Sequence, residues 1–131
     1  MKILVPVDGS DVSFRALNFA AEMMNRYDGS LHVVHITDRQ SETTEEIVER
    51  ANEILEAEGI EDEPEVEVDI DLDFRPSKRI GEDILTLVDE RGYDHVVMGH
   101  HGKTGAVEKA ILGSAVETVL DAQKVPVTVI P

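Results

Sequence analysis

Cysteine and tryptophan are absent from the 131-residue sequence, and long apolar runs are missing as well. Without cysteine the chain has no disulfide, no thiol nucleophile and no thiolate metal ligand. A reducing compartment is therefore the expected environment, and the fold must rest on a packed core. No segment approaches the roughly 20 continuous apolar residues that a membrane-spanning helix needs, so we expect no contact with a membrane. The first residues acquire charge too early for a signal peptide, which predicts a cytoplasmic protein.

Basic residues are also scarce. The sequence has 12 lysine and arginine residues against 28 aspartate and glutamate residues, a formal net charge of −16 at pH 7. A surface of that sign repels nucleic acids and anionic lipids, so neither is an expected partner. Acidic, lysine-poor surfaces are typical of proteins from a salt-rich cytoplasm, because a Debye length of about 3 Å at about 1 M salt screens the self-repulsion. The composition therefore predicts a halophilic source.

What the sequence does contain is a regular alternation of strand and helix patterns. Its length fits a single domain over residues 1–131, and 41% hydrophobic residues suffice for a core. Ser10 is the expected N-cap of the first helix, and Thr43 with Glu46 has the form of a capping box before the second. Predicted strands and helices alternate along the chain, which implies βαβ units and a parallel sheet. Besides the stretch described next, apolar runs predict strands at residues 3–7, 31–36, 95–98 and 127–130.

Residues 65–74 alternate without interruption between acidic and apolar side chains. This pattern predicts a half-exposed strand with its acids pointing outward, and such acids guard an edge strand against pairing with another chain. With that strand at one edge, right-handed crossovers give an open, Rossmann-like α/β fold: a five-stranded parallel sheet of order 3-2-1-4-5 with helices on both faces. Ligands bind such sheets where the strand order reverses, here between the first and fourth strands. Asp8 and the loop after Met98 follow those two strands.

A glycine-rich segment from Met98 to Gly105 follows the fourth predicted strand, and Gly113 and Ser114 come further on. Glycines after a strand let backbone N–H groups approach a phosphate. Gly113 is expected to open the next helix with Ser114 as a good N-cap, and the free N–H groups and positive end of that helix favour an anion. The spacing matches neither a Walker P-loop nor a dinucleotide fingerprint. The segment therefore predicts a phosphate-binding loop of another kind.

Several motifs in the right order make the chain resemble the universal stress protein family, in particular its ATP-binding branch. The resemblance rests on four segments: the glycine-rich segment, the N-terminal Ile-Leu-Val-Pro-Val-Asp-Gly-Ser, the segment Tyr-Asp-His-Val-Val-Met-Gly that leads into the glycines, and the C-terminal Val-Pro-Val-Thr-Val-Ile. These motifs span the whole chain. The resemblance implies an adenine nucleotide alpha hydrolase-like fold, a regulatory or stress-response role, a homodimer, and ATP or another adenine nucleotide bound with Mg²⁺.

The resemblance also implies the residues of the site. Asp8 and the backbone of Ile36 would contact the base, and Gly99 would lie near the ribose. The phosphates would be held by Gly102, Gly113, Ser114 and the amide of Ala115. The full set of implied nucleotide-binding residues is Pro6, Asp8, Ile36, Met98, Gly99, Gly102, Lys103, Gly113, Ser114 and Ala115. The expected dimer contact is the last strand, through Val127, Thr128, Val129 and Ile130.

The chain departs from the family pattern in one spacing. The family's usual spacer between Gly102 and the later glycine has nine residues, whereas residues 103–112 make ten here. An extra residue in a phosphate loop can displace the amides that hold the phosphates. A second interpretation therefore stays open: a stress protein of the same fold that binds no nucleotide and acts through dimerisation and partner contacts. A third, a phosphorelay receiver, is disfavoured because the third strand's acids point outward and the last strand does not end in lysine.

The sequence shows no acid–base pair, no nucleophile with its base and no metal site, so we expect no enzyme beyond slow ATP hydrolysis. His100 and His101 are adjacent, which does not favour one shared metal ion, although either ring could contact a phosphate. His32 and His35 lie three residues apart in a strand. They are expected on opposite faces of the sheet as ordinary hydrogen-bonded histidines.

Overall fold

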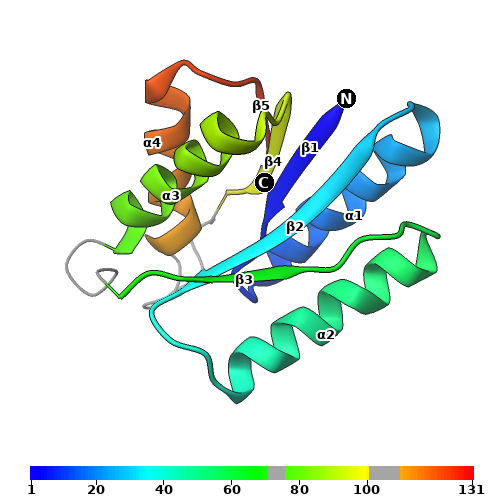
Figure 1. Ribbon diagram of the computed structural model, residues 1–131, viewed down its shortest axis with the longest axis horizontal. Coiled ribbons are helices and arrows are strands. Elements are labelled where there is room, and N and C mark those ends of the chain that lie inside the picture. The colour runs from blue at the N-terminus through cyan, green and yellow to red at the C-terminus, as the bar shows by residue number, and fades with distance from the viewer. Residues whose placement is uncertain (71–75, 101–109) are drawn as a thin grey trace.

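Five parallel strands form one sheet in the order β3-β2-β1-β4-β5, which confirms the predicted order. The computed structural model describes residues 1–70, 76–100 and 110–131, and Figure 1 labels their elements. The strands are β1 (Lys2–Pro6), β2 (Ser30–Thr37), β3 (Glu65–Val68), β4 (His95–Gly99) and β5 (Val127–Ile130). The helices are α1 (Asp11–Arg26), α2 (Glu42–Ala57), α3 (Pro76–Arg91) and α4 (Ala110–Ala122).

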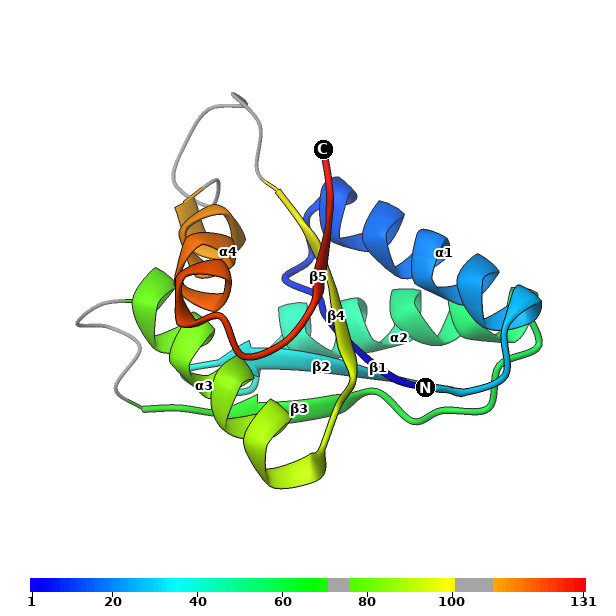
Figure 2. The same ribbon diagram turned by 90° about the horizontal axis from the view of Figure 1, so that it is seen from above.

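Two helices cover each face of the sheet. Figure 2 shows α1 and α2 on one side of the strands and α3 and α4 on the other. Neighbouring residues of β1 point to opposite faces, so Ile3 and Val5 pack toward α1 and α2, and Leu4 packs toward α3 and α4. All three side chains are fully buried. A strand covered on both faces needs a continuous apolar run, which explains the apolar opening of the chain.

The first two helices begin after serine residues. Ser10 is the N-cap of α1, as predicted, and its Oγ accepts a hydrogen bond from the N–H of Ser13 at 3.2 Å. The predicted capping box at Thr43 is wrong, because Ser41 is already the N-cap of α2 and its N–H donates to the Thr44 Oγ1 at 3.1 Å. No helix in the described ranges combines the length and the apolar character that crossing a membrane requires.

β3 lies at the edge of the sheet, as predicted, but it is shorter than predicted. The strand ends at Val68, and Ile70 already lies in a turn. The N–H of Asp69 still donates to the carbonyl of Thr37 at 2.8 Å, so pairing with β2 ends one residue after the strand. Residues 71–74, which the sequence also assigned to this strand, lie outside the described residues.

The acids of β3 do not point outward, and this part of the prediction is wrong. The register pairs Glu65 with Val34 and Glu67 with Ile36. Val34 and Ile36 pack toward α3 and α4, so the two glutamates face that side as well and are half-buried. Arg91 of α3 meets Glu65 there with two hydrogen bonds of 2.8 and 2.9 Å. The side chains of β3 do alternate between two faces, as predicted. However, α3 covers the acidic face, and its arginine supplies the positive charge that makes burial of the glutamates tolerable.

Candidate functional site

The ends of β1 and β4 are the place where the connections of the sheet diverge. The two strands are neighbours. β1 continues into α1 on one face of the sheet, whereas the chain after β4 continues to α4 on the other face (Figure 2). In open α/β sheets this divergence is where ligands bind. The fold thus brings the residues after β1 and the last residue of β4 to the predicted side of the sheet.

Asp8 follows β1 in a tight turn that its own carboxylate holds together. Its Oδ1 accepts hydrogen bonds from the N–H of Ser10 at 2.9 Å and from the Ser10 hydroxyl. Its N–H donates to the Oγ of Ser13 at 3.3 Å. Gly9 has a φ of +89°, a conformation that other residues adopt only with strain. Asp8 is half-buried. The carboxylate that holds the turn therefore remains partly accessible at the carboxyl end of β1.

Ile36, near the end of β2, can meet a ligand only through its backbone. Its side chain is 7% exposed and packs toward α3 and α4. The carbonyl of Val34 accepts a hydrogen bond from the N–H of Val7 at 2.9 Å. Because backbone groups alternate in direction along a strand, those of Ile36 face the same side, beyond the end of β1. Buried His35 holds this arrangement, since its Nδ1 donates to the Val7 carbonyl at 2.8 Å.

Gly99, the last residue of β4, lies directly against the first turn of α1. A Cβ atom at this position would lie 2.8 Å from the carbonyl carbon and oxygen of Val12. Backbone atoms cannot rotate away, so packing alone requires glycine here, whether or not a ribose lies nearby. Met98 is fully buried and packs toward α3 and α4. Pro6 is buried at the end of β1, so neither of these two side chains is exposed to a ligand.

The start of α4 differs from the prediction. The helix begins at Ala110, so Gly113 and Ser114 lie within it, and the prediction that Ser114 is its N-cap is wrong. Ala115 is fully buried. α3 and α4 pack so closely that a Cβ atom on Gly81 would lie 3.2 Å from the carbonyl oxygen of Ala115. This contact fixes the position of α4, and with it the backbone of the predicted phosphate-binding residues.

The strand ends hold one half of the predicted site. Five of the ten residues lie at the carboxyl ends of β1, β2 and β4, namely Pro6, Asp8, Ile36, Met98 and Gly99. Gly102 and Lys103 lie outside the described residues, together with most of the ten-residue spacer. The residues at these strand ends include Asp8, Ile36 and Gly99, which the resemblance assigns to the base and ribose.

A hollow of about 470 Å³ adjoins Asp8 and Ser10 on the side of α1 and α2. It includes none of the strand-end residues Pro6, Ile36 and Gly99. Carboxylates outnumber the one arginine among its remaining lining residues, which are Gly9, Asp11, Phe14, Thr43, Glu46, Ile47 and Arg50. The hollow therefore does not favour a phosphate, and Asp8 is the one residue that it shares with the predicted site.

Acidic side chains also gather between β3 and α3. Arg79 lies 3.1 Å from the carboxylate of Asp69. Burial, followed by the neighbouring Asp69, raises the pKa of Asp83 to about 7, and burial likewise raises the pKa of Glu67. The Oε2 of Glu67 and the Oδ2 of Asp83 are buried without a hydrogen-bond partner among the described residues. In the same ranges no group of three or more acids and histidines has the arrangement of a metal site. The space beside the carboxyl end of β3 therefore does not favour a phosphate.

Two residues that support the site were missed from the sequence. Ser13 is fully buried and its hydroxyl donates to the Ser10 carbonyl at 2.8 Å, but a serine in the first turn of a helix carries no general signal. Gly81 lies inside α3, where glycine costs about 1 kcal/mol relative to alanine. That cost is the signal that could have found it, because a helix keeps such a glycine where another backbone approaches closely.

Comparison with known proteins gives the chain a family. The model of the universal stress protein family matches residues 1–131. A universal stress protein of Methanocaldococcus jannaschii is 30% identical over 141 residues, which cover 98% of this chain and 81% of that protein.

Solved structures agree with this match. The universal stress protein from Archaeoglobus fulgidus in complex with dAMP has a TM-score of 0.72 and 27% identity, covering 100% of this chain and 98% of that one. A universal stress protein in complex with cAMP has a TM-score of 0.74, covers 100% and 96% of the two chains, and at 23% identity shows the likeness of fold alone. On the full-length family match and the 30% identical relative, the chain belongs to the universal stress protein family.

Proposed function

We propose that the protein binds an adenine nucleotide, ATP with Mg²⁺ in the first instance, at the carboxyl ends of β1 and β4. The observation that carries the proposal is the position of the Ile36 backbone groups, which face the space beyond the end of β1 beside Asp8. Bases are read through hydrogen bonds to their polar edges, and a strand's N–H and C=O groups supply one donor and one acceptor. The A. fulgidus relative in complex with dAMP supports an adenine nucleotide as the ligand.

The described residues fit the nucleoside half of such a ligand. The Ile36 backbone and Asp8 would contact the base and the atoms around it, and Gly99 would lie near the ribose. The acids between β3 and α3 repel phosphate, so the phosphates would extend toward β4 and the start of α4. Gly102, Lys103 and the backbone of residues 113–115 would hold them there. Mg²⁺, bound with the phosphates, would offset their charge in a protein of net charge −16.

The role we propose is regulatory, in a stress response, rather than catalytic. Nucleotide binding would then act through the state of a homodimer. We propose β5 as the dimer contact because it is the outer strand opposite β3 and all four of its residues are half-buried. Pairing with a second copy would cover the open edge of Val127, Thr128, Val129 and Ile130.

A second function, partner binding by the same fold without nucleotide, draws support from the start of α4. Only the first N–H groups of a helix lack partners within it. Because α4 begins at Ala110, Gly113 and Ser114 lie beyond the first residues of the helix. The ten-residue spacer points the same way. Dimerisation and surface contacts would then carry the function.

Thermal unfolding with and without Mg-ATP tests the proposal. A ligand at about 100 times its Kd adds about 2.7 kcal/mol, which raises the Tm of a chain of this size by roughly 8 °C. Asp8→Asn keeps an oxygen that accepts from the Ser10 N–H, so it keeps the turn but removes the charge. Asp11→Asn is the matched control, since Asp11 is exposed in the first turn of α1. A double variant, Gly102→Ala with Ser114→Ala, tests the phosphate half.

We expect the parent and Asp11→Asn to gain equal Tm with Mg-ATP, and Asp8→Asn and the double variant to lose most of the gain. A parent that does not respond to saturating ATP, ADP or dAMP would contradict nucleotide binding and favour the second function. An equal response from all variants would mean that the nucleotide binds elsewhere.

A further inference from the structure

β3 leaves one edge of the sheet open. It stands last in the strand order, and Figure 1 shows it as the outermost strand with α2 beside it. The N–H of Asp69 points to β2, where it donates to the Thr37 carbonyl at 2.8 Å. The backbone groups of the alternate residues, Val66 and Val68, therefore point away from β2 along the outer edge. A row of such groups is a template for another strand.

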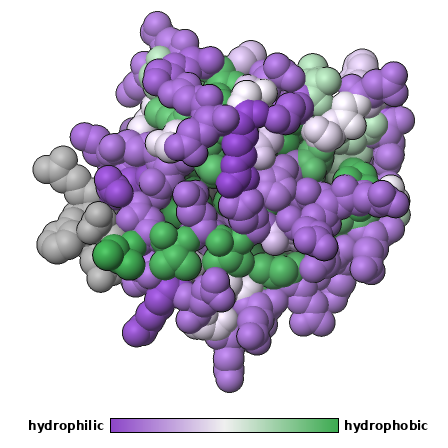
Figure 3. Space-filling view, in the orientation of Figure 1, coloured by the Kyte–Doolittle hydropathy of each residue, from purple (hydrophilic) through white to green (hydrophobic). Residues whose placement is uncertain are grey.

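The same alternate residues present apolar side chains. Val68 is 46% exposed and Ile70 is 78% exposed, while Val66 lines a groove between β3 and α2. In Figure 3 a row of hydrophobic side chains crosses the surface where Figure 1 shows β3, with hydrophilic residues around it. The strand's acids do not protect this edge, because they face α3 on the other side of the sheet. The outer edge of β3 is therefore apolar, and no strand among the described residues pairs with it.

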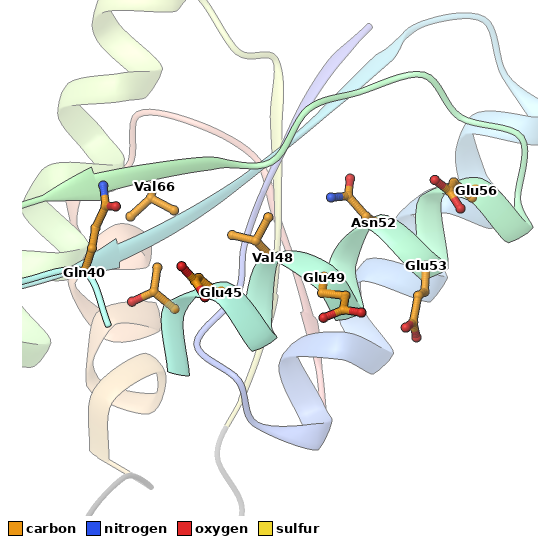
Figure 4. A pocket seen from close by; sticks show the side chains of 9 residues that line it. Gln40, Glu45, Val48, Glu49, Asn52, Glu53, Glu56 and Val66 are labelled. Atoms are coloured by element: carbon orange, nitrogen blue, oxygen red, sulfur yellow. The ribbon is translucent and has the colours of Figure 1, made fainter. Parts of the chain in front are cut away.

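The groove beside this edge is acidic. It has a volume of about 530 Å³, and none of its lining residues is basic. Figure 4 shows Val48 and Asn52 pointing from α2 toward β3, and β3 contributes Val66 to the lining of the groove. Arg50, the one basic residue of α2, lies instead over the ring of Phe14 at 5.2 Å. The four acidic lining residues are Glu45, Glu49, Glu53 and Glu56.

Three of these glutamates are spaced so that they repel one another. Glu45, Glu49 and Glu53 follow at intervals of four residues on one side of α2. Like charges at this spacing destabilise a helix by about 0.2 to 0.5 kcal/mol per pair. A cationic partner in the groove would offset this repulsion. None of the groove's own lining residues carries a positive charge that could offset it.

We propose that the outer edge of β3 binds an extended, lysine- or arginine-rich segment of another protein as an added strand. The backbone groups of Val66 and Val68 would pair with the segment. The aliphatic stems of its basic side chains would cover the two valines, and their charged ends would reach Glu45 and Glu49. A second copy of this chain is disfavoured as the occupant, because both copies would bring the same glutamates and a net charge of −16. The proposal is independent of nucleotide binding.

The probe is a fluorescent decapeptide of alternating lysine and threonine, and binding is followed by anisotropy. A decapeptide of the same sequence with every backbone amide N-methylated has equal charge but no N–H groups to donate to the β3 edge, so it is the control for simple charge attraction. We expect the first peptide to bind at least about tenfold more tightly, with an affinity that falls as salt rises.

Variants of the protein separate the two parts of the surface. Val68→Pro removes an outward N–H that the fold does not use, and proline is tolerated on an edge strand in that orientation. Glu49→Lys reverses one charge in the groove, and Glu117→Lys makes the same change on exposed α4, on the other face of the sheet. We expect Val68→Pro and Glu49→Lys to weaken the lysine–threonine peptide about tenfold, a change of about 1.4 kcal/mol, and Glu117→Lys to leave it unchanged.

Three results would overturn the proposal. Equal binding of the two peptides, or equal loss with Glu49→Lys and Glu117→Lys, would mean that net charge alone attracts them. A parent dimer that becomes a monomer with Val68→Pro in sedimentation would assign the edge to a second copy instead. Circular dichroism checks that Val68→Pro is folded; if it is not, Val68→Lys places a repelling charge at the same edge and must weaken the basic peptide in its place.

Discussion

The Nδ1 of His32 lies 2.9 Å from the Oδ1 of Asp62, and the Nε2 of the same ring lies 3.2 Å from the Oε1 of Glu65. The ring also stacks on Tyr93 with the two planes 2° apart. The hydrogen bond to Asp62 is the largest cause that raises the pKa of His32. Arg91 in turn lowers the pKa of Glu65 to about 2, so Glu65 stays charged. This cluster closes the end of the sheet opposite the candidate site.

His32→Gln should therefore cost more stability in acid than in alkali. The raised pKa of His32 means that its protonated ring contributes fully below the unfolded pKa of about 6.5, and the contribution is lost as the pH rises through the folded pKa. Urea unfolding at about pH 6 and about pH 9 measures this, and we expect the larger loss of unfolding free energy at pH 6. His100→Gln, on exposed His100, is the control. Equal losses at the two pH values would show that His32 acts by packing alone.

Asp83→Asn should stabilise the protein at alkaline pH. Burial and Asp69 raise the pKa of Asp83 to about 7, with Glu67 adding to the rise and Arg79 opposing it. The folded state then holds this proton more tightly than the unfolded chain, so the stability of the parent falls between about pH 4 and about pH 7 and stays low above. Asparagine stays neutral and removes this dependence.

The measurement for Asp83→Asn is the Tm of variant and parent from about pH 5 to about pH 8, and we expect their difference to grow with pH. Glu82→Gln is the matched control, because exposed Glu82 is the preceding residue of the same helix. A difference that is constant over this range, or one that Glu82→Gln reproduces, would contradict the raised pKa of Asp83.

Gly99→Ala should destabilise the fold by about 1 to 3 kcal/mol, as overpacking does. The new Cβ would meet the Val12 backbone at 2.8 Å, so α1 or β4 must shift. Gly59→Ala is the comparison: Gly59 has a φ of +70° but nothing within 4 Å of a new Cβ, and we expect about 1 kcal/mol of strain there. Urea unfolding measures both, and an equal or smaller loss for Gly99→Ala would contradict the close contact. The variant should also weaken nucleotide binding, since the shift reaches the Asp8 turn.

The sheet order followed from the sequence because each strand type leaves its own pattern. A continuous apolar run such as Ile3–Val5 fits a strand covered on both faces, and the alternation after Glu65 fits an edge. The direction of the acids did not follow, because alternation shows that two faces differ but not which one a helix covers. Arg79 and Arg91, which make the acidic face tolerable, lie far along the chain from β3 and have no signature of their own.

The candidate site followed only in part for a similar reason. Ser10 and Asp8 belong to a local turn, so their spacing predicts the hydrogen bonds that the structure shows. Gly99 was singled out for a ligand, but its packing against α1 depends on a contact between distant segments that no spacing records. The start of α4 at Ala110 was missed because Gly113 and Ser114 are a good helix-opening pair by composition, and context overrode this preference.

The net charge of −16 leads to a last prediction, that the Tm rises with KCl. Most of the acids repel one another across the surface, as the glutamates of α2 do. Raising KCl from about 0.1 M to about 1 M shortens the Debye length from about 10 Å to about 3 Å and removes most of this repulsion. Screening also weakens the exposed ion pairs, but these contribute about 1 kcal/mol or less each and are outnumbered by the excess acids.

A variant that lacks part of the repulsion separates charge screening from other effects of salt. Glu45→Gln, Glu49→Gln and Glu53→Gln together remove three negative charges from one side of α2. If repulsion limits stability, this variant should unfold at a higher Tm than the parent in about 0.1 M KCl and gain less on going to about 1 M. A Tm that is flat or falls with KCl in the parent would contradict the halophilic origin that we infer from the composition. An equal gain in both proteins would show that the salt acts through burial of apolar surface instead.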